Sequence, residues 1–391
     1  MSHRHLASRH AALHPAALHP AESDHSPQAV SLTRRAFSAT LATCAAAFAL
    51  PGMAAARVCA GKSAASNAAG AEHTHDWQWL VGNWDVWHQR LRERLANDTH
   101  WDEFAGKSAC WLTMGGLGTI DDNLLELPGG TYRALGIRAF NAQTGKWAIW
   151  WLDGRNPTSI EPPVMGGFDS NEGLFAGRDT FKGRPITMRF RWHDIHGAKP
   201  NWDQAFSTDD GATWEINWRN YFTRTAATPT PLPRLADANH DWDFLVGSWS
   251  VRHRRLRHRL VGNKDWDEFG GSLVNWPVLG GFGNVGDNVM EFPGGTVRGV
   301  GIRAFDPASA QWSSWWLDLR SPTAIDAPVR GGFKAGIGTF VGDDTLDGRP
   351  IKTRVQWSGI SANTARWEQS CSADGGATWE SNWVSEFSRK A

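Results

Sequence analysis

The sequence contains one segment written twice, 165 residues apart. Residues 75–225 align with residues 240–390 without a gap, starting at His75 and His240. Short structural repeats, such as propeller blades, have periods of about 40–50 residues, so a repeat of this length is a whole domain. The chain is therefore expected to contain two related domains. Residues 226–239 join them, and the alternating Pro229, Pro231 and Pro233 predict a short, extended spacer there.

Tryptophan follows the duplication closely. The chain has 24 Trp but only 2 Tyr, and every Trp lies inside one of the two copies. Each Trp of the second copy has a Trp at the matching position of the first, which adds only Trp79 and Trp87. Tryptophan is thus part of the design of the domain.

The local pattern within each copy has a period of two. Between Ile186 and Trp192, apolar residues alternate with polar ones, as in a strand with one buried and one wet face. Eight or nine such short runs can be counted in a copy, and no long helical period appears. Sequential short strands favour a closed antiparallel barrel, because closure removes exposed strand edges. The predicted fold class is all-β, with two tandem barrels.

Each copy begins with a helix-like turn, at 75–81 or 240–246, that runs into Leu-Val-Gly-x-Trp ending at Trp84 or Trp249. A pair of glycines follows the second strand, and Ser-x-Asp-x-Gly-x-Thr-Trp stands near the end. This ordered set resembles the calycin superfamily of lipocalin-like barrels, and most closely a bacterial lipocalin-like family of unknown function. The resemblance implies that the turn closes the barrel floor and that the Trp plugs it.

The Ser-x-Asp-x-Gly-x-Thr-Trp motif, at 207–214 and 372–379, also matches the Asp-box of sialidase propellers. We interpret it as a structural turn. The Asp accepts backbone N–H groups and the Gly permits positive φ, so the motif carries no chemistry of its own. The 165-residue repeat also excludes a propeller.

Strand parity brings several polar and aromatic groups toward the barrel interiors. If Trp84 points inward, so does His88, four positions further on. The candidate ligand-binding residues are His88, Glu103, Arg138, Trp151 and Asp153 in the first copy, and His253, Glu268, Arg303, Trp316 and Asp318 in the second. Such groups in a Trp-lined cavity bind a polar head group or perform acid–base chemistry. The alternative is that they pair with one another only to satisfy buried charge.

Two further basic positions flank this set. Arg92 and Arg94, with Arg257 and Arg259 in the second copy, lie in Leu-Arg-x-Arg-Leu. They suit an anionic ligand, or a solvated strand face beside Asp102 and Glu103. We favour the solvated face.

The first 56 residues predict an export signal. Arg34-Arg35 precede an Ala-rich apolar run, 36–50, and the small-residue site 54–56. This order is twin-arginine-like, and the run is too short to span a bilayer. Residues 57–74 are then a flexible mature N-terminus. A disordered Ala-rich tail is the alternative. The expected location is periplasmic or secreted.

Composition narrows the functional classes. Forty basic residues balance forty acidic ones, which disfavours a nucleic-acid or anionic-membrane partner. No metal, dinucleotide, P-loop or hydrolase motif is present, so no cofactor or metal is predicted. Cys110 matches Asn275 and Cys371 matches Phe206, so both are expected to be free thiols.

We therefore expect an exported protein that holds a small, partly apolar or aromatic ligand in one or both barrels. The alternative is a lipocalin-like enzyme that acts on a carbohydrate or cyclic metabolite. In that enzyme His88 and Asp153, or His253 and Asp318, would be the acid–base groups.

Overall fold

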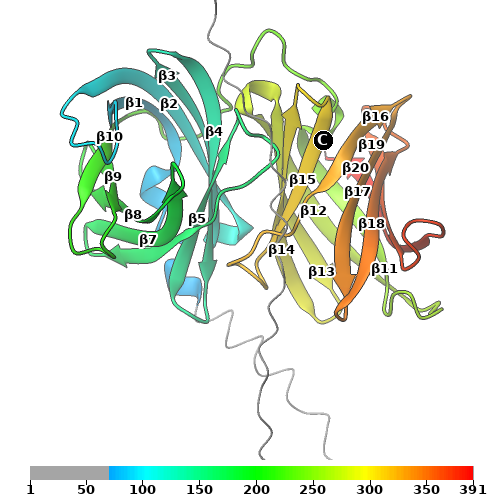
Figure 1. Cartoon of the computed structure of the whole chain (residues 1–391). Helices are drawn as coiled ribbons and strands as arrows, with labels where there is room; N and C mark the ends of the chain where they lie inside the picture. Colours follow the sequence, from blue (N-terminus) through cyan, green and yellow to red (C-terminus); the bar gives the residue numbers. More distant parts are fainter. Residues whose placement is uncertain (1–69, 391) are drawn as a thin grey trace, which may run out of the picture. The chain divides into compact units, whose positions relative to one another are not determined.

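A computed structural model describes residues 70–390 and shows two closed antiparallel barrels of ten strands each (Figure 1). The predicted all-β class is confirmed, but the count of eight or nine strands was one or two too low. Short strands with little alternation, such as the six-residue, Gly-containing β6, give a weak period-two signal. The expected signal segment, and the mature N-terminus up to residue 69, lie outside the described residues.

In the first barrel the strands follow one another in chain order, and β1 closes the barrel by pairing with both β2 and β10. The strands are β1 Gly82–Leu91, β2 Trp101–Thr113, β3 Gly118–Leu127, β4 Gly130–Asn141, β5 Lys146–Asp153, β6 Val164–Asp169, β7 Glu172–Phe181, β8 Arg184–His193, β9 Asn201–Ser207 and β10 Glu215–Ala226.

The second barrel repeats this topology, with β11 paired to both β12 and β20. Its strands are β11 Gly247–Leu256, β12 Trp266–Val278, β13 Gly283–Phe292, β14 Gly295–Asp306, β15 Gln311–Asp318, β16 Val329–Lys334, β17 Ile337–Leu346, β18 Arg349–Ser358, β19 Thr364–Ser372 and β20 Glu380–Arg389. The short 3-10 turns are η1 Ala71–His73, η2 Gln78–Leu80, η3 Met114–Gly116, η4 Asp243–Leu245 and η5 Leu279–Gly281.

A 3-10 turn fastens one end of each barrel, which we call the floor. In the first barrel the indole N–H of Trp84 donates to the Leu80 carbonyl of η2 at 2.8 Å. The Arg224 guanidinium of β10 stacks over the Trp84 ring at 4.0 Å and donates to the carbonyls of Trp79 and Val81. This clamp satisfies carbonyls that a short turn leaves free.

The second barrel repeats the clamp. Arg389 stacks over Trp249 at 4.2 Å and donates to the Phe244 and Val246 carbonyls at 2.7 Å. The expected helix-like turn at the start of each copy is thus a 3-10 turn joined to the last strand. The sequence pattern gave no sign of the Arg that holds it.

Aromatic side chains fill the floor from inside. Trp77 is fully buried and contacts the rings of Phe168, Phe175 and Trp192 at 4.8–5.8 Å between centroids. Trp242 makes the matching contacts in the second barrel. This packing explains why Trp is retained at the same positions in both copies, and it leaves space further along each barrel.

The two barrels belong to one compact unit, and they share an apolar cluster. The cluster includes the outward face of β5, through Trp150, and the outward face of β15, through Trp315. Trp111 and Trp276 also meet across it, with ring centroids 5.4 Å apart. Inter-strand alternation therefore gives β5 and β15 two apolar faces, one toward the barrel interior and one toward the other barrel.

Two reciprocal hydrogen bonds cross this apolar contact. The backbone N–H of Met114 donates to Asp287, and the N–H of Leu279 donates to Asp122, both at 3.0 Å. Met114 matches Leu279 and Asp122 matches Asp287 in the duplication. The contact is therefore isologous, like that of a two-fold symmetric dimer.

The connection between the copies is packed against the barrels. Thr230 exchanges hydrogen bonds with the Asn83 side chain at 2.8–2.9 Å, and the Pro233 carbonyl accepts from Arg133 at 2.6 Å. Leu232 is buried. The alternating prolines therefore lie in an anchored segment.

Both Asp-box motifs form the expected turn. The Asp209 carboxylate accepts from the Thr213 backbone N–H at 2.9 Å and from the Ser207 and Thr213 hydroxyls at 2.6–2.7 Å. These bonds, those of Thr213 first, lower the pKa of Asp209 to about 2. Gly211 has φ +95°, which a residue with a side chain rarely adopts. The structural interpretation of the motif agrees with this geometry.

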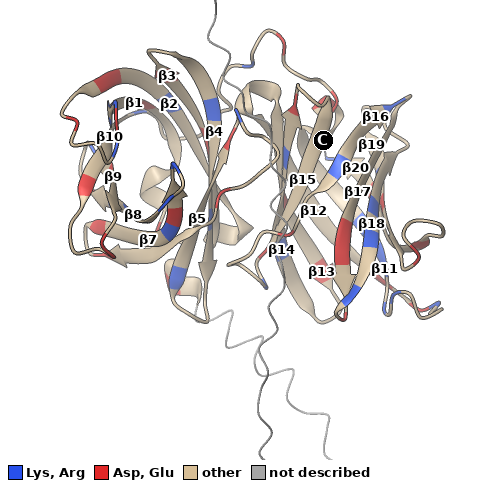
Figure 2. Cartoon of the chain, in the orientation of Figure 1, with Lys and Arg blue, Asp and Glu red and all other residues tan. Residues whose placement is uncertain are grey.

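Cys110 and Cys371 are both buried and free, as expected. Lys and Arg alternate with Asp and Glu over the strands and loops in the view of Figure 2. Among the described residues, no helix has the length and apolar character needed to cross a membrane.

Candidate functional site

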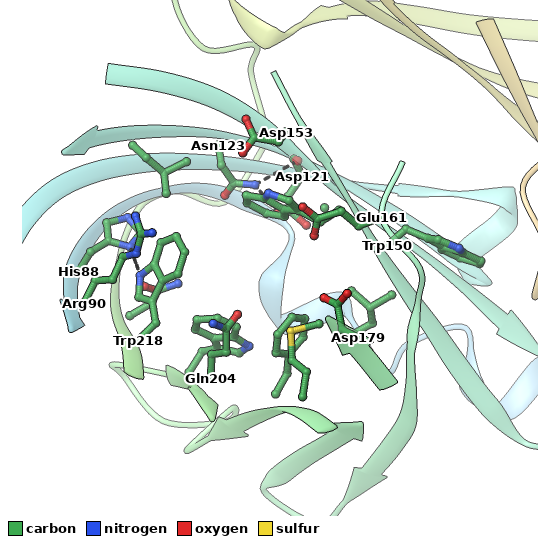
Figure 3. Close-up of a pocket in the computed structure, with 18 of the residues that line it drawn as sticks. His88, Arg90, Asp121, Asn123, Trp150, Asp153, Glu161, Asp179, Gln204 and Trp218 are labelled. Carbon is green, nitrogen blue, oxygen red and sulfur yellow. Dashed lines mark hydrogen bonds between the residues drawn. The ribbon is translucent and has the colours of Figure 1, made fainter. Parts of the chain in front are cut away.

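Each barrel encloses a cavity above the floor, of about 340 Å³ in the first and about 470 Å³ in the second. Cavities of this size hold small molecules. Both are lined by aromatic side chains together with arginines and carboxylates. Figure 3 shows His88, Arg90 and Trp218 on one wall of the first cavity, with Glu161 and Asp179 across from them.

Eight of the ten predicted residues line these cavities. They are His88, Arg138, Trp151 and Asp153 in the first barrel, and His253, Arg303, Trp316 and Asp318 in the second. Strand parity from Trp84 holds because the register shift in β1 falls before Trp84, between Asn83 and Trp84, and not between Trp84 and His88.

Glu103 and Glu268 do not reach the cavities, which corrects that part of the prediction. Phe104 of β2 packs inward, so its neighbour Glu103 must point outward. Glu103 accepts a hydrogen bond from Gln89 at 2.7 Å on the exposed face. Glu268 lies 3.5 Å from Arg254 in the same exposed position of the second barrel.

His88 is held as a neutral imidazole in the cavity wall. Its ring stacks on Phe104 with centroids 4.7 Å apart, and Nδ1 shares a hydrogen bond with the Asn220 amide at 2.6 Å. Burial lowers the pKa of His88 to about 4. His253 stacks on Phe269 and bonds Ser385, and burial lowers its pKa to about 4 as well. Neither imidazole has a carboxylate partner.

Asp153 is occupied by Arg155. Two guanidinium nitrogens contact the carboxylate, Nε to Oδ1 at 2.9 Å and Nη2 to Oδ2 at 2.5 Å. Arg155 in turn lies over the Tyr132 ring at 3.7 Å. Asp318 and Arg320 make the same two-pronged pair in the second barrel. Such bidentate pairs fix the position of both side chains.

A second pair of carboxylates at the cavity was not predicted. Burial, together with the nearby charges of Asp179 and Asp153, raises the pKa of Glu161 to about 7. In the second barrel burial and the charges of Asp344 and Asp318 raise the pKa of Asp326. Glu161 lies on the loop after β5, where no periodic pattern marks it. Its spacing of 165 residues from the acidic Asp326 was the available signal.

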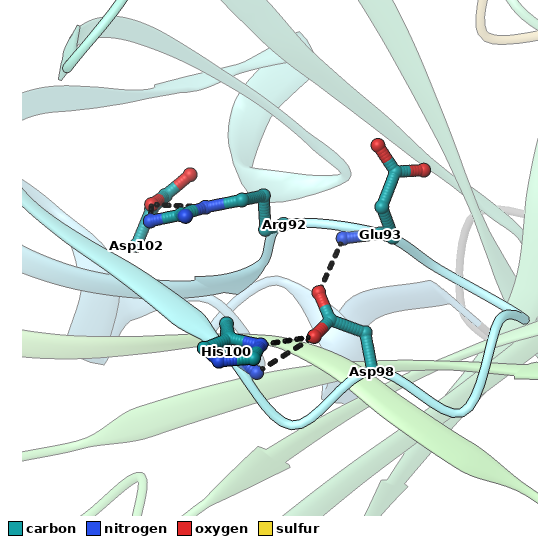
Figure 4. A network of polar contacts seen from close by, with 5 residues as sticks. All are labelled: Arg92, Glu93, Asp98, His100 and Asp102. Carbon is teal, nitrogen blue, oxygen red and sulfur yellow. Dashed lines mark hydrogen bonds and ion pairs between the residues drawn. The ribbon is translucent and has the colours of Figure 1, made fainter.

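The basic Leu-Arg-x-Arg-Leu segments divide between the surface and the cavity. Arg92 turns outward and donates to Asp102 at 2.8 Å, beside the loop in which Asp98 bonds His100 and the Glu93 N–H (Figure 4). This outcome agrees with the solvated face that we favoured.

Arg94 differs from that expectation. It lines the first cavity and stacks over the Phe181 ring at 4.4 Å. Burial and the nearby Arg90 lower the pKa of Arg94 to about 10, so the guanidinium stays charged at neutral pH. Arg259 lines the second cavity.

The two cavities differ at the floor. In the first, the guanidinium of Arg138 lies 4.4 Å from the Trp77 ring, hydrogen-bonds Thr119 at 3.1 Å and forms an ion pair with Asp121. In the second, Arg303 lies 4.3 Å from the Trp242 ring and bonds only the Asn284 amide oxygen, at 2.7 Å.

No family model matches this chain. No curated protein sequence is similar to it either. Among solved structures, the chain is similar to a protein of unknown function of the DUF3598 family from Nostoc punctiforme. The two are 11% identical, the match covers 81% of this chain and 99% of that one, and the TM-score is 0.25. A similarity this low bears on neither site nor function.

Proposed function

We propose that this chain is an exported binding protein whose two calycin-type barrels hold small, partly aromatic ligands. The observation that carries the proposal is the cavity in each barrel, which is lined by Trp together with a few fixed polar groups. Stacking on Trp151 or Trp218 suits a flat ring, and the arginines of the wall suit an oxygen-rich substituent. The export signal comes from the sequence alone.

The described polar groups favour binding over catalysis by the His–Asp pair. His88 and Asp153 each have other partners, Asn220 and Arg155. An imidazole with a pKa of about 4 is a weak base at neutral pH. Both groups therefore serve as fixed walls of the cavity.

One observation keeps an enzyme as the second candidate. Glu161 has a pKa of about 7 at the edge of the cavity, which is the range of a general acid or base. Its neighbour Asp179 would then be the group that keeps one proton on the pair. Glu161→Gln separates the two functions, because it abolishes turnover in an enzyme and leaves binding largely intact in a binding protein.

Native mass spectrometry of the protein purified from its own host tests the proposal. We expect a retained small molecule that is released on unfolding. Ser314→Trp fills the wall of the second cavity and should remove the adduct from that barrel, whereas the outward-facing Ser250→Trp should not. A chain that carries no adduct, and whose Trp fluorescence no aromatic compound quenches, would refute binding.

A further inference from the structure

Three substitutions between the copies surround the floor arginine. Around Arg138 the first barrel has Cys110, Thr119 and Asp121. At the matching positions around Arg303 the second barrel has Asn275, Asn284 and Gly286. The carboxylate that neutralises the first arginine is therefore missing from the second.

The amides that replace these groups do not supply a charge. Asn275 and Asn284 hydrogen-bond each other through both side chains, at 2.8 and 2.5 Å. Asn284 then offers Arg303 one shared amide oxygen. The Nε of Arg303 is buried without any hydrogen-bond partner.

Burial without a counter-ion lowers the pKa of Arg303 to about 9, which still leaves it protonated at neutral pH. An uncompensated buried charge is costly, so the second barrel carries a cation that its own side chains do not neutralise. Arg303 borders the larger of the two cavities.

The space for an anion lies above Gly301. In the first barrel the Asp121 carboxylate lies over the matching Gly136, where an added Cβ would be 2.6 Å from its oxygen. In the second barrel an added Cβ on Gly301 would meet only the Arg303 guanidinium, at 3.3 Å or more. The side of Gly286 is filled by Leu273, so an anion must reach Arg303 from the cavity.

We infer that the second barrel binds a ligand bearing a carboxylate, which pairs with Arg303 over Gly301 as Asp121 pairs with Arg138 over Gly136. The inference rests on the proposed binding function and names its ligand class. The first barrel, whose arginine is already neutralised, takes a ligand with no acidic group at this end.

The other charges at the second cavity do not replace this counter-ion. Arg320 is engaged with Asp318, and the Asp344 carboxylate accepts a hydrogen bond from Thr353 at 2.9 Å. Asp326, Arg255 and Arg259 complete the charged lining, and no described carboxylate lies within ion-pair distance of Arg303. The carboxylate end of the ligand therefore points to the floor.

The test compares 2-naphthylacetate with its uncharged amide by isothermal titration calorimetry on the whole chain. We expect the acid to bind at least about tenfold more tightly than the amide, as for a hydrogen bond to a charged group. Arg303→Met should abolish this preference. So should Gly286→Asp with Leu273→Ser, which rebuilds the first barrel's internal pair without removing the arginine.

The outcomes are distinct. Equal binding of acid and amide, or an acid preference that survives in both variants, overturns the carboxylate site and leaves the binding function standing. Binding of neither compound counts against both. Near-UV circular dichroism checks that each variant is folded, and the double variant keeps the comparison valid if Arg303→Met unfolds.

Discussion

The Asp122 carboxylate of the first barrel accepts a hydrogen bond from the backbone N–H of Leu279 in the second, at 3.0 Å. Asp287 and Met114 make the same contact in the opposite direction. Each carboxylate lies beside the shared apolar cluster and satisfies a backbone group that the contact would otherwise bury unpaired. Burial raises the pKa of Asp122 to about 7, partly offset by Arg133.

Because this contact is isologous, one barrel alone should pair with a copy of itself. A polypeptide of residues 240–390 exposes the face formed by Trp276, Val285 and Trp315, and Asp287 of each copy can accept from Leu279 of the other. We expect a homodimer by analytical ultracentrifugation, and a monomer after Val285→Arg. A stable monomer of the unmodified fragment at tens of micromolar would contradict the prediction.

Acid should destabilise the protein through its two cavity histidines. The pKa of about 4 in the folded state lies below the ordinary 6.5, so between these values the unfolded chain binds protons that the folded chain does not. The cost is absent above pH 6.5 and grows to about 3 kcal/mol for each histidine near pH 4.

Urea denaturation between pH 4 and 7 measures this effect. The double variant His88→Gln/His253→Gln should show a flatter loss of stability than the unmodified protein over the same range. Parallel curves would mean that the imidazoles are not held neutral by the fold.

The Asp-box turns should matter for stability and not for binding. Asp209→Ala removes the acceptor of the Thr213 N–H and both hydroxyls, so we expect the melting temperature to fall by a few degrees. Affinity per folded molecule, measured by titration calorimetry, should be unchanged. A large loss of affinity with unaltered melting would reverse the structural assignment of this motif.

Export should depend on the twin arginine. Replacing Arg34 and Arg35 by Lys is expected to leave unprocessed protein in the cytoplasm, which cell fractionation and mass spectrometry of the N-terminus detect. Normal processing of that variant would show that another signal directs the chain.

Periodicity predicted the parts of this structure that depend on one strand at a time. The alternation from Trp84 placed His88 in the cavity, and that of β5 placed Trp151 and Asp153 there. The same rule, applied to Glu103 without fixing which neighbour faced inward, failed because Phe104 occupies the inner position. The tenth strand was missed for a related reason, since β6 lacks a clear alternation.

Pairing across strands could not be predicted in the same way. Asp121 and Arg138 lie 17 residues apart on β3 and β4, and they meet only because Thr119 stands opposite Arg138 in the register. The Asp121-to-Gly286 difference is visible in the aligned copies. Its meaning depends on that register, which the residue pattern does not fix.

The isologous contact within a single chain has a consequence for how such a protein can vary. In a homodimer every substitution enters both pockets at once, and a change that suits one ligand is imposed on the other site. Here the shared face, with its reciprocal Asp122 and Asp287 bonds, is kept in both halves while each interior is encoded separately. One chain can therefore carry two dissimilar specificities at a fixed one-to-one ratio, with no assembly step to choose between partners.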